Sequence, residues 1–300
     1  MEFNQEHQDQ LAKSLSSKLG FDPNSLQRFK NGSAAVYRVG LDSVLKLQHP
    51  NWTSDKEAEL ESTCLRILSK QFKGFTPELI DSGKEDDIHY LLMGDLQGED
   101  LLDVWKDVSL ENRLQIFEEL GNKTKAMHSV DPHEFIPYCE NWNSFLDQQI
   151  AKCVQNHTKK ELQKEWLSEV APWIESIDWK TEKKKDNVIL HTEIMRDHLK
   201  VIKTKGEWQL SGIFDFGDAM VGPKEYEFVS IGCLAAGGEK DLLQAFFKGY
   251  GYQPEKDFSK MMMAYLLIHK YSNIEWFLDH VPISQEIHSL DGLASVWYGV

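Results

Sequence analysis

The sequence predicts an α+β fold, with a small N-terminal lobe built on an antiparallel sheet and a larger, mostly helical C-terminal lobe. Short apolar strands separated by turns fill residues 26–93, and one helix interrupts them. From residue 101 onward, apolar residues recur mainly at helical spacing, apart from a hairpin at 199–213. The glycine-flanked segment 94–98 breaks the pattern and reads as a hinge. We therefore expect one lobe at residues 1–96 and another at 97–300.

Composition narrows the class of protein. The 300 residues contain 41% hydrophobic residues and no low-complexity tract, which is typical of a globular protein with a sizeable core. The net charge of −15 disfavours nucleic acid and anionic membranes as partners and suits a cationic ligand. Four scattered cysteines, a polar N-terminus and the lack of a long apolar run favour a cytoplasmic location.

The N-terminal region begins with an amphipathic helix at residues 6–19, which Gly20 ends. Strands are then expected at 26–30, 36–39 and 44–47. The loop between the first two, residues 31–35, consists of small side chains that allow a close approach to a ligand. Its backbone N–H groups, with Gly32 and the hydroxyl of Ser33, are candidates to cover nucleotide phosphates.

Lys46 is the only charged residue in the apolar strand 44–47. A buried ammonium group needs an anionic partner, and nucleotide phosphates together with a carboxylate of the next helix would supply it. That helix is expected to begin near Ser54 and to continue to residue 68. Glu61 is the preferred partner because Leu65 and Leu68 mark the buried face near it. Glu57, one turn earlier, is the alternative.

Two more strands, at 75–80 and 89–93, are expected to complete the sheet before the hinge, with a charged turn at 83–87 between them. In the hinge, backbone groups of Asp95 and Leu96 are candidates to pair with an adenine edge. A long helix follows at 114–129, and His128 is expected to be a helix-end residue. Further helices are expected in 141–179, 231–247 and 261–297.

The stretch 187–228 carries the strongest functional signal. A buried strand at 188–190 leads into the segment 191–198, and the hairpin at 199–213 leads into Asp215-Phe216-Gly217. Acidic residues on both sides of a hairpin suit phosphoryl transfer from a nucleotide. One carboxylate can accept the proton of the attacking hydroxyl, and the other can hold the metal on the phosphates.

This stretch resembles the catalytic segment of protein kinases, an H-x-D-x-x-x-x-N loop followed by D-F-G. His191 matches the histidine, Glu193 stands at the position of the base, and His198 stands five residues later in place of the asparagine. Asp215 opens an intact D-F-G and is expected to hold Mg²⁺. Asp197 is an alternative base, because it follows an arginine as the kinase aspartate does.

The departures from this pattern affect the chemistry expected of the loop. Glu193 keeps a carboxylate but adds about 1 Å of reach, and a misplacement of that size can cost on the order of 100-fold in rate. Mg²⁺ prefers oxygen ligands, whereas the imidazole of His198 suits softer metals. Mn²⁺ therefore stays open as an alternative metal, and His198 is an alternative contact for phosphate or for Glu193.

Taken together, these features resemble the aminoglycoside phosphotransferase family over nearly the whole chain. The resemblance rests on the small-residue loop, Lys46, Glu61, the hinge, His191-Thr192-Glu193, Asp215 and Gly222-Pro223. Glu227 matches an acid that the family carries after this last motif, and residues 264–299 resemble hygromycin-type members. The family loop normally reads His-Gly-Asp, with an asparagine further on, so Thr192, Glu193 and His198 depart from it.

The resemblance implies a bilobal protein-kinase-like fold and a role for each matched residue. Lys46 is expected on the nucleotide phosphates, Glu61 beside it, Glu193 as base, Asp215 on Mg²⁺ and His198 at the second metal position. The implied function is transfer of the γ-phosphoryl group of ATP or GTP to a hydroxyl of a small cationic, aminoglycoside-like acceptor, as in antibiotic resistance. The alternative is a nucleotide-binding pseudokinase with a regulatory or scaffold role. A protein kinase is disfavoured because no Ala-Pro-Glu motif follows Asp215.

Overall fold

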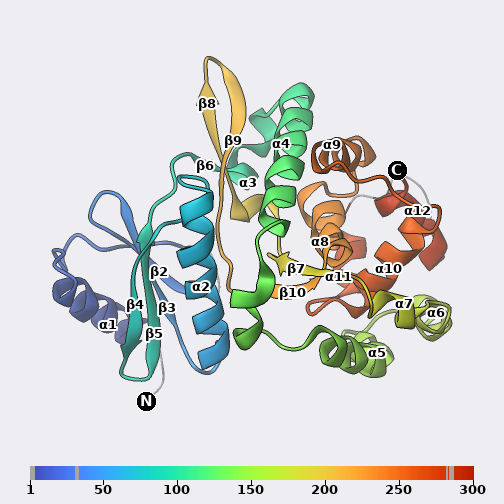
Figure 1. Ribbon diagram of the computed structural model, residues 1–300, viewed down its shortest axis with the longest axis horizontal. Coiled ribbons are helices and arrows are strands. Elements are labelled where there is room, and N and C mark those ends of the chain that lie inside the picture. Colours follow the sequence, from blue (N-terminus) through green and yellow to red (C-terminus); the bar gives the residue numbers. More distant parts are fainter. Residues whose placement is uncertain (1–3, 31–33, 282, 284–286) are drawn as a thin grey trace. The chain divides into compact units, whose positions relative to one another are not determined.

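A computed structural model describes residues 4–30, 34–281, 283 and 287–300 of the protein. The chain separates into two compact units. Unit 1 comprises residues 1–99, 200–202 and 211–218, and unit 2 comprises residues 100–199, 203–210 and 219–300. The expected lobes were residues 1–96 and 97–300; unit 1 also includes two pieces of the hairpin region. Figure 1 labels the elements along the chain.

The helices and strands have the following bounds. The helices are α1 (Gln5–Lys18), α2 (Asp55–Gln71), α3 (Leu101–Val104), α4 (Leu110–His128), α5 (Trp142–Lys159), α6 (Lys164–Glu175), α7 (Trp179–Glu182), α8 (Lys224–Ser230), α9 (Lys240–Tyr250), α10 (Phe258–Ile268), α11 (Ile274–His280) and α12 (Leu290–Tyr298). The strands are β1 (Gln27–Arg28), β2 (Ala35–Val39), β3 (Ser43–Gln48), β4 (Leu79–Glu85), β5 (Ile88–Gly94), β6 (Glu99–Asp100), β7 (Asn187–Leu190), β8 (Leu199–Thr204), β9 (Glu207–Ile213) and β10 (Met220–Pro223).

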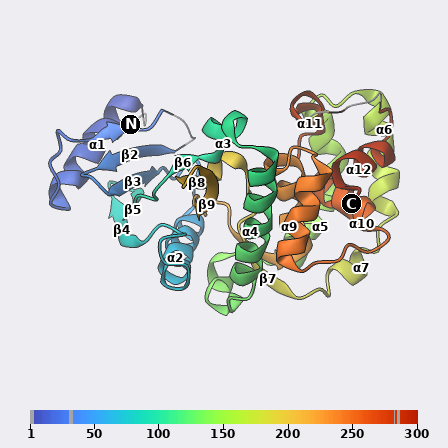
Figure 2. The ribbon, with the colours of Figure 1, turned by 90° about the horizontal axis from the view of Figure 1, so that it is seen from above.

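Unit 1 contains a five-stranded antiparallel sheet in the order β1-β2-β3-β5-β4. Helices α1 and α2 lie on opposite sides of this sheet (Figures 1 and 2). Successive side chains of a strand point to opposite faces. On β3, Leu45 and Leu47 belong to the apolar cluster that includes Leu11 and Leu15 of α1. Lys46 therefore points to the other face, which α2 covers.

Strand β4 is shifted from its predicted place. It was expected at residues 75–80 with a long charged turn after it, but it spans Leu79–Glu85. Asp86 and Asp87 alone form the turn, at φ of 48° and 65°. This is the backbone of a two-residue hairpin turn, in which aspartate is tolerated. The charged residues before it were misleading, because β4 is an edge strand whose alternate side chains are exposed.

Helix α2 begins where its sequence predicted. Ser54 is the N-cap and forms a capping box with Glu57, whose side chain accepts from the Ser54 backbone N–H at 2.8 Å. Glu57 therefore stabilises the start of the helix. One turn later, Glu61 lies on the buried face with Leu60 and Cys64. This placement brings the carboxylate of Glu61 to the sheet face that carries Lys46.

Unit 2 is mostly helical and contains the short antiparallel pair β7–β10. Helices α4 and α9 lie side by side (Figure 2). Glycine permits their close approach, since a Cβ atom at Gly121 would lie 2.0 Å from the Phe246 carbonyl oxygen. A Cβ atom at Gly249 would lie 1.8 Å from the carbonyl oxygen of Glu118. Strand β10, which the sequence did not predict, pairs with β7 and thereby fixes the strand that leads into residues 191–198.

Candidate functional site

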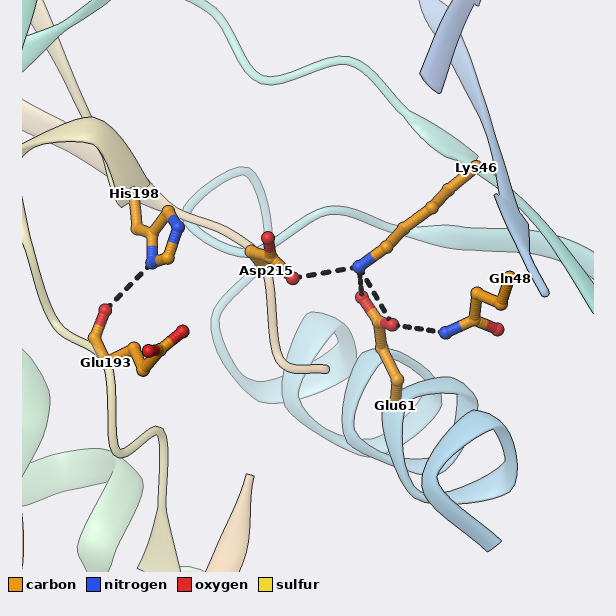
Figure 3. Close-up of polar contacts among 6 residues, drawn as sticks. All are labelled: Lys46, Gln48, Glu61, Glu193, His198 and Asp215. Carbon is orange, nitrogen blue, oxygen red and sulfur yellow. Dashed lines mark hydrogen bonds and ion pairs between the residues drawn. The ribbon is translucent and has the colours of Figure 1, made fainter. Parts of the chain in front are cut away.

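Unit 1 contains a buried ion cluster among the candidate site residues. Lys46 Nζ donates to both carboxylate oxygens of Glu61, at 2.8 and 3.0 Å, and to Oδ1 of Asp215 at 2.8 Å (Figure 3). The bidentate contact comes from Glu61, whereas the alternative partner Glu57 belongs to the cap of α2. One cation faces two anions in this cluster, so the three groups carry one net negative charge.

Burial and charge act in opposite directions on this cluster. Burial alone would lower the pKa of Lys46, but Asp215 and Glu61 outweigh it and raise the pKa well above its usual range. Lys46 is therefore a fixed cation at physiological pH. Burial is also the main cause that raises the pKa of Glu61, and Lys46 opposes it. The two short contacts to the ammonium group indicate that Glu61 is ionised.

Gln48 is a member of this cluster that sequence reasoning missed. Its side-chain nitrogen donates to Oε2 of Glu61 at 2.6 Å, and the residue is buried (Figure 3). It lies two residues after Lys46 on β3, so both side chains point to the same face of the sheet. A polar residue two positions after a buried lysine in a strand was the sequence signal that could have placed Gln48 in the cluster.

Asp215 follows β9 in a backbone conformation that few residue types adopt. Its φ is 67°, in the left-handed region, which aspartate tolerates better than most side chains. A Cβ atom at Gly217 would lie 3.3 Å from Asp215 Oδ1 and 3.5 Å from Lys46 Nζ. Glycine at 217 therefore leaves room around the cluster. The side chain of Asp215 is 41% exposed, in contrast to 2% for Glu61, so its carboxylate can meet a ligand.

These groups fit a magnesium ion bound together with a nucleotide. Carboxylate oxygen is the donor that Mg²⁺ prefers, and nucleotide-bound Mg²⁺ takes one or two carboxylates with phosphates and water. Within residues 4–30, 34–281, 283 and 287–300, no group of three or more His, Cys, Asp and Glu side chains could hold a metal ion. A dedicated protein cage is thus absent from that part of the chain, and a site shared with phosphates does not need one.

The hinge residues Asp95 and Leu96, which were predicted to contact the nucleotide, both make contacts within unit 1. The Asp95 backbone N–H donates to the Asp42 carbonyl at 2.9 Å, and its carboxylate pairs with Arg38 at 2.7 Å. A contact of Asp95 with a base would therefore use its carbonyl group. Leu96 packs beside Gly212, where an added Cβ would lie 2.8 Å from Leu96 Cδ1. Gly32 and Ser33 lie outside the described residues.

Unit 2 contains a separate group of candidate residues, the loop 191–198, and Glu227 holds the beginning of this loop. The backbone N–H groups of His191 and Thr192 donate to the two carboxylate oxygens of Glu227, at 2.6 and 2.8 Å. Glu227 is fully buried. His128 lies behind it, with Nε2 3.5 Å from the carboxylate and Nδ1 2.9 Å from the Tyr250 hydroxyl. His128 is the last residue of α4, and it also belongs to this buried network.

Thr192 has an unusual backbone for its residue type. Its φ is 69°, a genuine outlier for a β-branched residue. Thr192 stands where the family pattern has glycine, which adopts this conformation without a steric cost. The two hydrogen bonds to Glu227 keep the loop in this conformation in spite of the strain.

A hydrogen bond across the loop joins His198 to Glu193. His198 Nδ1 donates to the Glu193 carbonyl oxygen at 2.8 Å, so the hydrogen of the neutral ring lies on Nδ1 (Figure 3). A metal at His198 would have to bind Nε2. The rings of His191 and His198 lie 5.8 Å apart, and Asp197 sits in a 3₁₀ turn at Arg196–His198. Glu193 and Asp197 are both half-buried, so exposure does not separate the two candidate bases.

In the described part of the chain, no helix combines the length and the apolar composition that crossing a membrane requires.

Comparison with solved structures identifies the fold. The GDP complex of wild-type aminoglycoside 2'-phosphotransferase-IIIa superposes with a TM-score of 0.67 at 15% identity, over 93% of this chain and 97% of that one. The streptomycin–ATP–APH(2")-IIa ternary complex gives 0.63 at 16% identity, over 90% and 95%. Aminoglycoside phosphotransferase APH(3'')-Id from Streptomyces rimosus gives 0.60 at 14%, over 85% and 95%. These likenesses confirm the predicted protein-kinase-like α+β fold.

Sequence comparison supplies the family. No curated protein matches the sequence closely enough to count as a relative. The profile of the phosphotransferase enzyme family, APH, matches residues 25–262, which is most of the chain and includes every site residue described above. The resemblance to aminoglycoside phosphotransferases read from the sequence is confirmed, and the chain belongs to the phosphotransferase enzyme family.

Proposed function

We propose that the protein is a small-molecule kinase that transfers the γ-phosphoryl group of ATP or GTP to a hydroxyl of an aminoglycoside-like acceptor. The observation that carries the proposal is the buried Lys46, which contacts both Glu61 and Asp215. A permanently charged ammonium group next to a half-exposed carboxylate suits a triphosphate and its metal. Family membership supports the same chemistry.

Unit 1 supplies the nucleotide-binding groups in this proposal. Lys46 contacts the phosphates, and Glu61 and Gln48 hold Lys46 in place. Asp215 would hold Mg²⁺, with Mn²⁺ as an alternative, and the metal would neutralise charge that develops on the phosphates. Backbone groups of the hinge residues Asp95 and Leu96 contact the adenine or guanine ring of the nucleotide. Gly32 and Ser33 are proposed to cover the phosphates.

Loop 191–198 supplies the general base, the group that accepts the proton of the acceptor hydroxyl. The acceptor oxygen attacks the γ-phosphorus, its proton moves to the carboxylate of Glu193, and the bond from the γ-phosphorus to the bridging oxygen breaks to release the nucleoside diphosphate. His191 and His198 fix the loop around Glu193. His198 is also a proposed second metal ligand through Nε2. Asp197 is the alternative base.

The acceptor is proposed to be a small cationic molecule with hydroxyl groups. Similar solved structures include complexes with kanamycin, streptomycin and gentamicin. The net charge of −15 agrees with a cationic acceptor, because an acidic protein attracts it from solution. Phosphorylation of such a molecule would make the protein an antibiotic resistance factor.

The test is nucleotide consumption by the purified protein with ATP or GTP, with Mg²⁺ or Mn²⁺, across a panel of aminoglycosides that includes hygromycin. Turnover that an acceptor stimulates and that Asp215→Ala abolishes would support the proposal. Lys46→Met should raise the nucleotide KM, because it removes the phosphate contact. Binding of nucleotide without turnover by any acceptor in the panel would instead favour the pseudokinase alternative, to which the altered Thr192, Glu193 and His198 also point.

A matched pair of variants identifies the base. Glu193→Gln keeps the size of the side chain but cannot accept the proton, so kcat should fall by roughly 100-fold to 10,000-fold while nucleotide affinity stays close to that of the wild type. Asp197→Asn should change kcat only a few-fold. The reverse result would assign the base to Asp197.

A further inference from the structure

Arg196 lies inside loop 191–198, between Glu193 and His198, and its side chain is only 17% exposed. Its Cζ atom lies 3.7 Å from the centroid of the Trp105 ring, and Nε donates to the Ala235 carbonyl oxygen at 2.7 Å. Nη2 lies 3.9 Å from the carboxylate of Glu239. The guanidinium group thus contacts residues of two segments of unit 2, around 105 and 235–239, that lie far from the loop in the sequence.

Trp105 contacts a second guanidinium group besides that of Arg196. Arg113 Cζ lies 4.1 Å from the same ring centroid, and Arg113 Nη2 donates to the Trp105 carbonyl oxygen at 2.7 Å. Both distances lie within the range of a cation–π contact, so the ring interacts with two cations. Burial lowers the pKa of Arg196 to about 10. The nearby carboxylate of Glu239 acts to raise this pKa, and the positive charge of Arg113 acts to lower it further. Arg196 therefore remains charged at neutral pH in an environment that disfavours a cation.

The carbonyl that accepts from Arg196 lies at the end of a helix. Helix α8 continues into a π-helical turn, Ile231–Ala235, and the chain then leaves the helix through Gly237 and Gly238 at φ of 63° and 75°. The last carbonyls of a helix lack partners within the helix and attract cations. A Cβ atom at Gly237 would lie 2.9 Å from Arg196 Nη2. Glycine at 237 therefore provides both the turn and the space for the guanidinium group.

We propose that Arg196 is a positioning residue for phosphoryl transfer, which fixes loop 191–198 to Trp105 and to the end of the π-helical turn so that the Glu193 carboxylate is held in place. This inference rests on the proposed function. Lysine cannot replace arginine here, because the site uses a planar group that stacks on a ring and donates sideways to a carbonyl at the same time.

The experiment compares Arg196→Lys and Arg196→Gln with the wild type in the full chain. We expect kcat to fall by roughly 10-fold to 100-fold, since a displacement of about 1 Å at a reacting group costs that much. The nucleotide KM should stay within about twofold, because Lys46 and Asp215 are untouched. Amide hydrogen exchange of residues 191–198 should become faster. Gly237→Ala, which intrudes on the same guanidinium group, should reproduce these effects if Arg196→Gln does not fold.

Arg113→Gln is the matched control, because it removes the other cation on the same ring but no group of the loop. It should leave kcat and the exchange of residues 191–198 close to the wild type. Equal effects of Arg113→Gln and Arg196→Gln would overturn the proposal, as would unchanged exchange and unchanged kcat in both Arg196 variants. If the wild-type protein shows no turnover, the proposed function is rejected but the role of Arg196 is not. The hydrogen-exchange measurement then still decides whether Arg196 holds the loop.

Discussion

The carboxylate of Glu227 accepts the backbone N–H groups of His191 and Thr192 and thereby orients the first residues of the candidate catalytic loop. Both of its oxygens are used, and the residue is fully buried. An amide in its place would direct an NH₂ group at one of the two N–H donors. A buried donor without an acceptor costs free energy, so the site specifies a carboxylate and not merely a polar side chain.

Glu227→Gln is therefore expected to lower the free energy of unfolding by about 2 kcal/mol. This is a typical value for the loss of a hydrogen bond to a buried charged group. It should also lower kcat, because the loop loses one of its two anchors. Denaturant unfolding and steady-state kinetics measure the two effects. Glu225→Gln on the same helix is the control, since that carboxylate pairs with Lys185 at 3.7 Å and not with the loop. Equal losses in the two variants would contradict the anchoring role.

Helices α5 and α10 are joined by polar contacts from α5 to the end of α10. His157 Nε2 donates to the Leu267 carbonyl oxygen at 2.9 Å, and Cys153 Sγ donates to the same oxygen at 3.4 Å. His157 is 1% exposed, and this burial lowers its pKa. The neutral ring is thus the form that fits between the two helices.

This burial predicts a dependence of stability on pH. The unfolded chain protonates His157 near pH 6.5, whereas the folded chain does so only at a lower pH. The contribution of His157 is therefore complete above about pH 6.5, and the free energy of unfolding should decrease as the pH falls below that value. His157→Gln, which can still donate to Leu267, should show a shallower decrease in denaturant unfolding at pH 5 to 7. The same slope in both proteins would refute this assignment.

The pairing of α4 with α9 depends on two positions without side chains. Gly121→Ala should lower the free energy of unfolding by about 3 kcal/mol or more, because the methyl group meets a carbonyl oxygen in a well-packed interior. Gly249→Ala should act similarly. Asn122→Ala, at the neighbouring exposed position of α4, serves as the control and should be neutral or slightly stabilising. Thermal unfolding would show the difference as a shift in Tm.

For the whole molecule, the sequence predicted the fold class and the order of most elements because hydrophobic period and capping residues are local signals. It also indicated Lys46 and Glu61, since a lone charge in an apolar strand requires a partner, and Asp215, since it opens a D-F-G motif. It did not indicate the contacts of Tyr250 or Arg196, because these join residues distant in the chain, and Gln48 was missed although it lies two residues after Lys46. Strand β4 was misplaced for a related reason, since an edge strand tolerates charges that locally resemble a turn.

The net charge of the whole chain leads to a prediction about the acceptor. If a cationic aminoglycoside is the substrate, its kcat/KM should fall by roughly tenfold as ionic strength rises from low to well above physiological, because salt screens the attraction to an acidic protein. An acceptor analogue without amino groups should lack this dependence. A kcat/KM that does not change with salt would show that net charge has no part in acceptor capture.

The glycine contacts between α4 and α9 also bear on how the sequence can vary. Each clash at Gly121 or Gly249 would be with a main-chain oxygen of the other helix, which no substitution can shorten or remove. A change at one position therefore has no compensating change at the other. Selection from a library randomised at both codons should return glycine at each site independently, without the correlated pairs that mark side-chain contacts.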